Sequence, residues 1–292
     1  MKSVAILMTV HNRREQTLSC LRDVYAQIAT FSGSDSAAAG EEEGGLDRLS
    51  WHVFLTDDGS TDGTREAVER EFPEVTIIRG DGNLYWNRGM YTAWFTARRD
   101  PHDYILWLNN DVRLYPDAFR SLLNTSMAQD DKAIIVGALE EAPESGQISF
   151  GGRDRSGLVG GSGTLREVRL MNGNLVLLPR FAYCHVGLLD PHYHHAFGDY
   201  DYALRAGSRG IKILASAEFL GWCHADRRVQ PCFDPRQSLL SRWRYLYSPL
   251  SYFHPRQAFY FDRRHNNLLI ALTRWVLIHL QTLFPRLKCV GE

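Results

Sequence analysis

The sequence predicts an α/β fold in which helices flank a mixed, mostly parallel sheet. The first observation is that short apolar runs alternate with segments of helical periodicity from residue 3 to residue 138, a pattern typical of βαβ units. The second is that three of these apolar runs end in polar clusters. The third is the composition, with 44% hydrophobic and 23% charged residues, which is globular and argues against disorder, collagen and a coiled coil.

The elements expected in this first part follow in order along the chain. The apolar run 3–10 ends at His11 and suits a buried strand; a signal peptide would need a longer apolar region. Leucines at 18 and 21, with Tyr25 and Ile28, have helical spacing and predict a helix over 14–29. Small, acidic and Gly-rich residues predict a loop over 32–49. The remaining elements are strands at 51–56, 75–78, 104–108 and 133–138, and helices at 60–72 (capped by Thr61 or Asp62), 87–99 and 116–128.

The pattern changes after residue 140. Residues 143–165 are rich in Gly and Ser and predict loops or hairpins. A strand is expected at 174–178, a helix at 200–209 that Gly210 closes, and a strand at 211–215. This change of pattern divides the chain at about residue 138, and the charge and aromatic content change again after residue 226. Residues 227–292 form a helical C-terminal extension in this division.

The charge of the chain is uneven. The formal net charge is −1, which gives no global basic field for nucleic acid. Residues 227–292, however, contain 11 Lys and Arg against three Asp and Glu, a net charge of +8, and many aromatic side chains. This composition suits peripheral contact with an anionic membrane; the alternative is a helical cap on the domain or on a second subunit in a homodimer. The apolar stretch 268–284 is interrupted by polar residues and lies at the short end of the spanning range.

The five cysteines form no CxxC pair, and their odd number argues against a disulfide framework. A reducing compartment fits best, and we expect a cytoplasmic protein.

Polar residues follow three of the expected strands: His11 after the first, Asp57 and Asp58 after the second, and Asn109-Asn110-Asp111 after the fourth. The carboxyl ends of parallel strands share one edge of a sheet, where ligands bind. The aspartates at 57 and 58 could accept hydrogen bonds from a ribose or a base, and Asp111 could hold a divalent cation together with substrate phosphates. The alternative for each cluster is an ordinary capped turn.

A later cluster surrounds the start of the helix expected near residue 200. Asp199 is either an acid that complements the helix dipole or a general base for an acceptor hydroxyl. The histidines at 192, 194, 195 and 224, with Cys223 and Cys232, lack the paired spacing of a structural zinc site. His224 could instead contact a metal or a phosphate, or be a satisfied loop residue. The sequence contains neither a P-loop nor a GxSxG nucleophile elbow.

The motifs and their order resemble a known family. They are Thr9-Val10-His11-Asn12, TDDGSTDGT, GNLYWNRGM, LNND, HAFGDYDYALRA and the late His224. The chain is similar, over roughly residues 1–226, to the family 2 glycosyltransferases of the GT-A fold. The resemblance implies a catalytic domain over 1–226, with a nucleotide-binding half at about 1–138 and an acceptor half at about 139–226. It resembles in particular the bacterial enzymes that build capsule, O-antigen and other cell-surface polysaccharides, including rhamnosyltransferase-like members.

The resemblance implies a nucleotide-diphosphate sugar donor of the UDP or dTDP type, a divalent metal (Mn or Mg) and inversion at the anomeric carbon. It places Thr9, His11, Asp57 and Asp58 near the nucleotide. Asp111 matches the last residue of the D-x-D metal motif, and His224 matches a histidine that reaches the metal or the diphosphate. Asp199 matches the general base. Two departures stand out: Asn109 replaces the first aspartate of D-x-D, and Gly198 replaces the glutamate before the base.

Seven further residues could line the sugar or acceptor pocket, the alternative being ordinary loop packing: Asn83, Trp86, Asn87, Asn110, Asn172, Gly173 and Asn174. The expected acceptor is a hydroxyl of a glycan or of a polyprenyl-linked glycan. Two other functions stay open on the sequence. A nucleotidyltransferase would need a Gly-rich basic loop near the first strand, where HNRRE has arginines but no glycine. A non-catalytic binder of nucleotide or sugar is consistent with the altered D-x-D motif.

Overall fold

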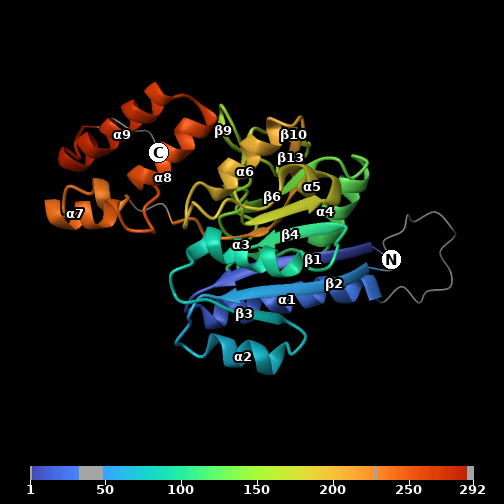
Figure 1. Ribbon diagram of the computed structural model, residues 1–292. Coiled ribbons are helices and arrows are strands. Elements are labelled where there is room, and N and C mark those ends of the chain that lie inside the picture. Colours follow the sequence, from blue (N-terminus) through green and yellow to red (C-terminus); the bar gives the residue numbers. More distant parts are fainter. Residues whose placement is uncertain (1, 33–48, 227–228, 288–292) are drawn as a thin grey trace.

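The computed structural model describes residues 2–32, 49–226 and 229–287. Within them, a sheet of ten strands has the order β10-β13-β6-β12-β4-β1-β2-β3, with β5 paired to β13 and β7 to β6 (Figure 1). Its strands are β1 (Lys2–Val10), β2 (Leu49–Asp57), β3 (Thr76–Arg79), β4 (Tyr104–Leu108), β5 (Arg113–Leu114), β6 (Ile134–Glu140), β7 (Ile148–Phe150), β10 (Arg166–Glu167), β12 (Leu175–Pro179) and β13 (Ile213–Trp222). A small antiparallel sheet consists of β8 (Gly152–Asp154), β9 (Gly157–Val159) and β11 (Leu170–Met171).

Parallel pairing at the centre of the large sheet determines where the strand ends meet. β1 pairs in parallel with β2 on one side, where Val10 lies opposite Asp57, and with β4 on the other. β1 therefore has β2 on one side and β4 on the other, so the order of the strands switches sides at β1. Such switch points are where α/β proteins bind ligands. The polar residues after β1, β2 and β4 consequently share one edge of the sheet.

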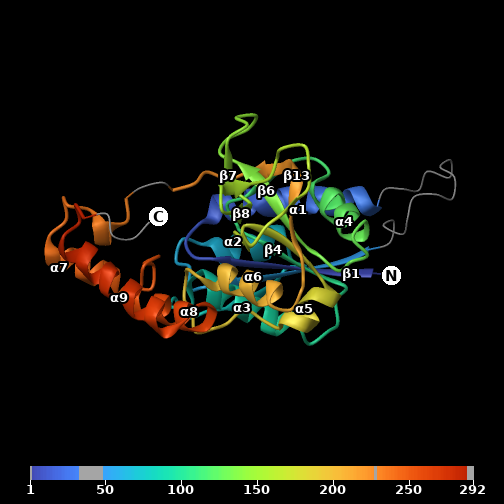
Figure 2. The same ribbon diagram turned by 90° about the horizontal axis from the view of Figure 1, so that it is seen from above.

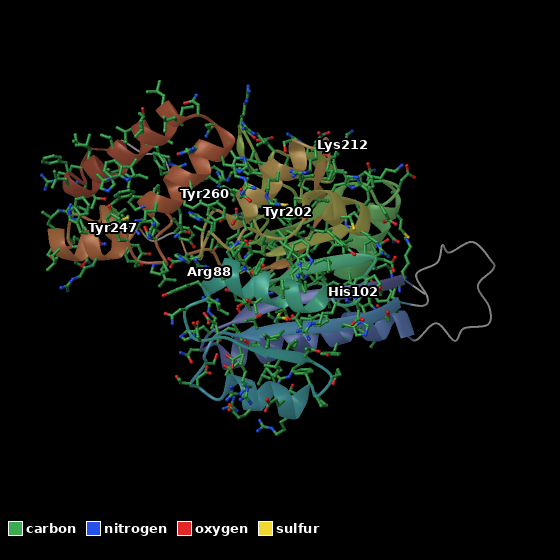
Figure 3. The ribbon with its side chains drawn as sticks, viewed as in Figure 1. Arg88, His102, Tyr202, Lys212, Tyr247 and Tyr260 are labelled. Carbon is green, nitrogen blue, oxygen red and sulfur yellow. The ribbon has the colours of Figure 1, made fainter. Side chains whose placement is uncertain are left out.

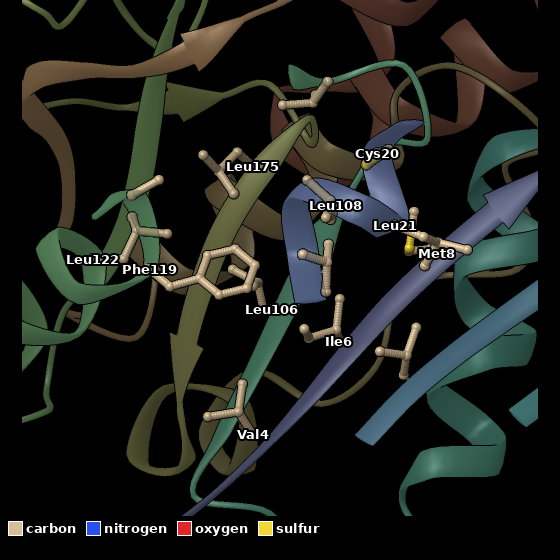
Figure 4. Close-up of a cluster of buried hydrophobic side chains, with 14 of the residues drawn as sticks. Val4, Ile6, Met8, Cys20, Leu21, Leu106, Leu108, Phe119, Leu122 and Leu175 are labelled. Atoms are coloured by element: carbon tan, nitrogen blue, oxygen red, sulfur yellow. The ribbon is translucent and has the colours of Figure 1, made fainter. Parts of the chain in front are cut away.

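Helices cover both faces of the sheet (Figure 2). They are α1 (Arg14–Ser32), α2 (Thr64–Glu71), α3 (Tyr85–Ala97), α4 (Ala118–Met127), α5 (Arg180–Val186) and α6 (Gly198–Gly207). Side chains alternate along β1: Val4, Ile6 and Met8 pack in one core with α1, α2 and α4 (Figure 4), whereas Ala5 and Leu7 pack in a second core with α3, α5 and α6. Both cores consist of buried hydrophobic side chains, because the strands of a sheet covered on two faces are buried on both sides.

The α/β class and the mostly parallel sheet are confirmed, and the helices and strands expected between residues 3 and 138 are present. Three details differ. β12 runs antiparallel to both of its neighbours, β4 and β6; α5 was not expected; and β13 continues to Trp222, well past residue 215. The helix expected over 60–72 begins only at Thr64, because residues 57–63 form a turn in which Asp62 Oδ1 accepts the Thr64 N–H. The loop expected over 32–49 falls almost entirely outside the described residues.

Three helices follow the sheet and lie beside it (Figures 1 and 2). They are α7 (Leu239–Leu246), α8 (Pro255–His265) and α9 (Leu268–Leu283), preceded by a 3₁₀ turn at Pro231–Phe233. A third buried cluster joins them to the loop before α6, where Tyr193 and Phe197 meet Phe261 and Ile278. The helical character expected of this segment is thus present, while the domain boundaries at residues 138 and 226 stay predictions. No helix in the described part of the chain is both long and apolar enough to cross a bilayer.

Candidate active site

The turn after β2 holds the start of α3 in place. Asp58 is buried, and its carboxylate accepts three backbone N–H groups: Gly82 on Oδ1 at 2.8 Å, and Leu84 and Tyr85 on Oδ2 at 2.9 Å each. Asp57 is also buried, and its Oδ1 accepts the Ser60 N–H at 3.0 Å. The Asp58 carboxylate is therefore engaged in shaping the loop before α3, and the role of both aspartates in nucleotide binding stays a prediction.

Residues at the end of β1 border the same turn. His11 Nδ1 lies 2.6 Å from the Asp58 carbonyl oxygen; because a carbonyl only accepts, His11 carries a proton on Nδ1. Thr9 lies against Gly89 of α3. A Cβ added at this glycine would lie 2.1 Å from Thr9 Oγ1. Gly89 thus allows α3 to approach β1 closely. The structure brings Thr9, His11 and Asp58 together as the sequence predicts.

Asp111, which follows β4, has two partners. Its Oδ2 accepts a hydrogen bond from Arg13 Nη1 at 2.5 Å, and the Cys223 Sγ lies 3.7 Å from its Oδ1. Burial and the charge of Asp111 raise the pKa of the Cys223 thiol, so the thiol stays protonated and donates. Arg13 comes from the loop after β1 and Cys223 from the end of β13, so three strand ends meet at this carboxylate.

His224 lies next to this group but faces another carboxylate. Its Nδ1 lies 2.5 Å from Glu141 Oε1, and its side chain is 82% exposed. No group of three or more His, Cys, Asp and Glu side chains in the described ranges is arranged to hold a metal ion. Asp111 and His224 are nevertheless suitable donors for a cation that takes most of its remaining oxygens from a diphosphate, as Mg²⁺ does in phosphate-transfer sites. In this structure Asp111 pairs with Arg13 and His224 with Glu141, so the role of these two residues as metal ligands stays a prediction.

Asp199 lies in the first turn of α6, where backbone amides fix its carboxylate. Oδ2 accepts the Gly173 N–H at 3.1 Å and Oδ1 accepts the Tyr200 N–H at 2.9 Å. Burial raises the pKa of Asp199 to about 6, although the amides act in the opposite direction. A carboxylate whose pKa lies just below neutral is mostly ionised at pH 7 and still a competent proton acceptor, which is what a general base requires.

Trp86 connects the Asp199 region to the end of β4. Its indole Nε1 donates to Asn109 Oδ1 at 2.7 Å. A Cβ added at Gly173 would lie only 2.4 Å from the Trp86 ring, so the ring packs directly on the glycine. The Asn109 N–H in turn donates to the Asn174 carbonyl at 2.9 Å. Trp86, Gly173 and Asn174 are thus brought together beside Asp199, and Asn109, which stands in place of an aspartate, has a structural partner.

Other residues predicted for the pocket are placed differently. Asn110 is buried and donates to Thr17 Oγ1 at 3.0 Å, on the α1 side of the sheet. Asn83 bonds within its own exposed turn to the Asp81 carbonyl. Asn172 Oδ1 lies 3.4 Å from the Gly151 N–H, in the loops that precede Asp199. The structure therefore does not gather Asn83 and Asn110 with the others.

Asn87 and Gly198 fit against each other. Asn87 is fully buried, and its Nδ2 donates at 2.8 Å to the carbonyls of Asp190 and Tyr193. A Cβ on Gly198 would lie 1.8 Å from Asn87 Oδ1 and 2.5 Å from its Cγ. The space that a side chain at position 198 would need is therefore occupied by Asn87, which makes the glycine before Asp199 a packing requirement of this chain.

Replacing Gly198 with alanine should destabilise the protein by about 1–3 kcal/mol, the usual cost of overpacking a fully buried site. Urea unfolding monitored by circular dichroism measures the change. Gly207→Ala in the same helix is the matched control, because a Cβ there meets nothing within 4 Å; alanine at that position should be neutral or up to about 1 kcal/mol stabilising. Equal effects of the two substitutions would show that Asn87 does not restrict position 198.

Three residues that the sequence did not assign to the site lie beside its predicted residues: Arg13, His195 and Tyr252. Tyr252 lies between α7 and α8 and is 50% exposed; its partial burial raises the pKa of its phenol. Its ring centroid lies 5.5 Å from that of His195. Burial, with the charge of Arg13, lowers the pKa of His195 to about 4, so its imidazole is neutral at physiological pH.

Arg13 had a sequence signal as a basic residue directly after the polar end of the first strand, and His195 as a member of the histidine group that begins at residue 192. Tyr252 follows Asp199 by more than 50 residues and lies in a segment whose composition pointed to a membrane surface. A cavity of about 170 Å³, lined by Trp94, His102 and Tyr183 among others, lies near the amino end of β4. It is remote from the polar strand ends and carries none of the predicted site residues.

Comparisons with known proteins agree with this arrangement. The mannosyltransferase PcManGT from Pyrobaculum calidifontis, solved with GDP-mannose and Mn²⁺, matches with a TM-score of 0.54 at 15% identity, over 98% of this chain and 72% of that one. TarS from S. aureus matches with a TM-score of 0.52 at 13% identity, over 96% and 72%. GalNAc-T7, solved with UDP, GalNAc and Mn²⁺, matches with a TM-score of 0.52 at 12% identity, over 93% and 56%. At these identities the likeness establishes the fold. No curated protein sequence matches the chain significantly.

The family is established by the sequence itself. The model of glycosyl transferase family 2 matches residues 5–173, which is more than half of the chain and includes Asp57, Asp111 and Gly173. The sheet flanked by helices is the GT-A architecture of the three solved structures. The chain therefore belongs to glycosyl transferase family 2, and it is a glycosyltransferase of the GT-A fold.

Proposed function

We propose that the protein is an inverting glycosyltransferase that moves a sugar from a nucleoside diphosphate, of the UDP or dTDP type, to a hydroxyl of a glycan or polyprenyl-linked glycan. Its expected place is the cytoplasmic side of bacterial surface-polysaccharide synthesis, with rhamnosyl-type transfer the specific form that its motifs resemble. The observation that carries the proposal is the Asp199 carboxylate. Two backbone amides fix it, and burial raises its pKa to about 6.

The transfer step follows from the chemistry of Asp199. The carboxylate accepts the proton of the acceptor hydroxyl while the oxygen forms a bond to the anomeric carbon. The bond between that carbon and the diphosphate oxygen breaks on the opposite face of the sugar, which inverts the anomeric configuration. The Gly173 and Tyr200 amides keep the carboxylate in one orientation, so little reorganisation is needed when the proton arrives.

The donor side is formed by the strand ends. Thr9, His11 and Asp57 border the space in which we place the nucleoside. Arg13 is a cation beside this space and can contact the diphosphate. Asp111 and His224 would hold a divalent cation, which supplies neutralisation of the charge on the leaving diphosphate. Two of the solved structures of similar fold contain Mn²⁺ with a nucleotide or nucleotide sugar, which supports this assignment.

Nucleoside diphosphates should raise the melting temperature of the protein, and more so with Mn²⁺ or Mg²⁺. A ligand at about 100 times its Kd adds about 2.7 kcal/mol, which in a domain of this size corresponds to roughly 5–10 °C. Thermal-shift measurements with uridine, thymidine and guanosine diphosphates, each with and without metal, identify the base. Nucleoside monophosphates are the ligand control. Asp111→Asn should reduce the extra shift that the metal supplies and keep the metal-free shift.

The reaction itself is tested by product analysis. Release of nucleoside diphosphate that requires an acceptor supports the proposal. Release of pyrophosphate from a nucleoside triphosphate and a sugar phosphate, or donor binding without any turnover across acceptors, would contradict it.

A further inference from the structure

Helix α9 packs on the protein through a side of mixed polar and apolar residues and has an aliphatic side turned outward. The side that packs on the protein carries Ala271, Arg274, Ile278, Gln281 and Thr282, of which all but Arg274 are buried. The opposite side is a row of exposed aliphatic residues at helical spacing: Leu269, Leu272, Val276, Leu280 and Leu283. Leu269 is 73% exposed. A helix on the surface of a protein in water normally has the reverse arrangement, so this face requires an apolar environment.

Aromatic residues border the aliphatic row. Trp275 packs against His279 at 4.0 Å between ring centroids, and Tyr247, at the outer end of the extension (Figure 3), bonds to His279 Nε2 through its hydroxyl at 2.8 Å. Trp243 of α7 stacks on Tyr247. Aromatic rings with one polar edge are typical of the interface between membrane and water. Leu240 of α7 is also exposed.

The exposed charge of the extension between residues 229 and 287 has one sign. Between residues 229 and 287 the sequence has two carboxylates, Asp234 and Asp262, and both are buried. They are bonded to Arg236 and to Asn266, respectively. Four further arginines of the same range are exposed, at positions 244, 256, 263 and 286. The surface of the extension is therefore cationic as well as apolar.

Polar contacts on the inner side explain why α9 lies this way round. Arg274 approaches Asp262 at 3.4 Å and lies over the Phe197 ring, with its guanidinium carbon 5.6 Å from the centroid. Arg264 of α8 bonds to Asp190 at 2.6 Å, and His265 to Asp201 at 2.8 Å. The inner side of the extension is thus bound to the transferase domain by ion pairs and hydrogen bonds, which leaves the leucines outside.

We propose that the outer face of α9, with the adjoining residues of α7, is a docking surface for an anionic lipid bilayer. A second copy of the chain could cover the leucines, but it would bring two cationic surfaces together. An anionic bilayer offers an apolar environment to the aliphatic row and negatively charged headgroups to the arginines. α9 has 16 residues and is about 24 Å long, shorter than the roughly 30 Å hydrocarbon core; it therefore lies in the plane of the membrane.

The extension packs on α6, the helix that carries Asp199, through the contact of His265 with Asp201, so docking would bring the bilayer to the part of the molecule that adjoins α6. This consequence, which rests on the proposed function, makes a lipid-carried acceptor accessible to Asp199. The membrane contact itself does not depend on the transfer reaction.

Co-sedimentation with vesicles tests the proposal without any turnover. The protein should bind vesicles of phosphatidylcholine in which about a quarter of the lipid is phosphatidylglycerol, and bind phosphatidylcholine alone much more weakly. Salt should weaken binding to the anionic vesicles, because exposed charges are screened. The triple variant Leu272→Glu, Val276→Glu, Leu280→Glu should lose binding, and Arg244→Gln should weaken it about fivefold.

Leu165→Glu is the matched control, because Leu165 is similarly exposed but lies outside the extension; it should bind as the wild type does. If the triple variant loses its circular dichroism signal or melting transition, the single variant Leu269→Glu takes its place in the binding test. Absence of binding to anionic vesicles, or binding that the α9 variants leave unchanged, would overturn the proposal. So would a dimer in sedimentation analysis that the α9 variants dissociate, in a protein that does not bind vesicles.

Discussion

Replacing Asp199 with asparagine should lower turnover at least about 10²-fold while nucleotide binding and the fold are kept. General-base assistance is worth about 10²–10⁴-fold, and asparagine cannot accept the proton. Its side-chain oxygen can still accept the Gly173 N–H, so the local structure has a partner for this amide. Turnover by nucleoside diphosphate release, nucleotide affinity by titration and melting temperature by calorimetry separate the three effects.

The pH profile of the wild type gives an independent signature of the same residue. Transfer needs ionised Asp199, so kcat/KM should fall as the pH drops below about 6. Stability should change in the opposite direction. The folded-state pKa lies above the usual value near 4, so the native state binds this proton more tightly than the unfolded chain. The contribution of Asp199 to stability therefore rises as the pH falls from about 6 to about 4, and Asp199→Asn should lose this dependence.

Asp130→Asn provides the control for this substitution. Asp130 lies in the exposed turn before β6, at the other end of the sheet, and has a φ of 54°, a conformation that asparagine tolerates well. It should transfer sugar at the wild-type rate. Transfer by the Asp199 variant at a rate close to that of this control would refute the base assignment.

The sheet edge of the site was predictable from the sequence because parallel pairing places strand ends side by side. Once β1, β2 and β4 are identified as parallel strands, His11, Asp57 and Asp111 have to share an edge. The hydrogen-bond partners of each carboxylate were less predictable. The Asp58 side chain accepts three amides from a loop more than 20 residues away, and a pattern of turn residues does not reveal such a contact.

The second half of the site depends on contacts that are remote in sequence. The antiparallel β12 lies between β4 and β6, and it is the loop before this strand that brings Gly173 to Asp199. Tyr252 reaches the same place from the C-terminal extension. α5 has only seven residues and no side-chain cap, so its packing against α6 rather than its propensity makes it helical. None of these features follows from periodicity.

The helix that carries Asp199 is held by a buried ionic network. Asp201, two residues further along α6, is fully buried and accepts hydrogen bonds from Arg205 Nε and from His265 of α8, at 2.8 Å each. Arg264 lies 3.3 Å from the same carboxylate. Burial alone would raise the pKa of Asp201, but its partners hold that pKa below the usual range. The network thus joins α6 to the extension (Figure 3 labels Tyr202 on α6 and Tyr260 on α8).

Asp201→Asn should lower the free energy of unfolding by about 3–5 kcal/mol, since removing one partner leaves the buried Arg205 without a compensating charge. Urea unfolding at pH 7 measures the loss. The folded-state pKa of Asp201 is lowered, so its contribution is present above about pH 4 and is lost as the pH falls further. The difference between the variant and the wild type should therefore shrink in acid.

Glu167→Gln tests whether burial is the reason for so large an effect. Glu167 and Lys212 also form an ion pair, at 3.7 Å, but both side chains are more than 60% exposed, and such pairs contribute about 0–1 kcal/mol. A loss in the Asp201 variant no larger than in this control would mean that the network does not stabilise the junction. α6 would then owe its position to the aromatic packing of Phe197 and Phe261, and the coupling between the extension and Asp199 would have to run through those rings.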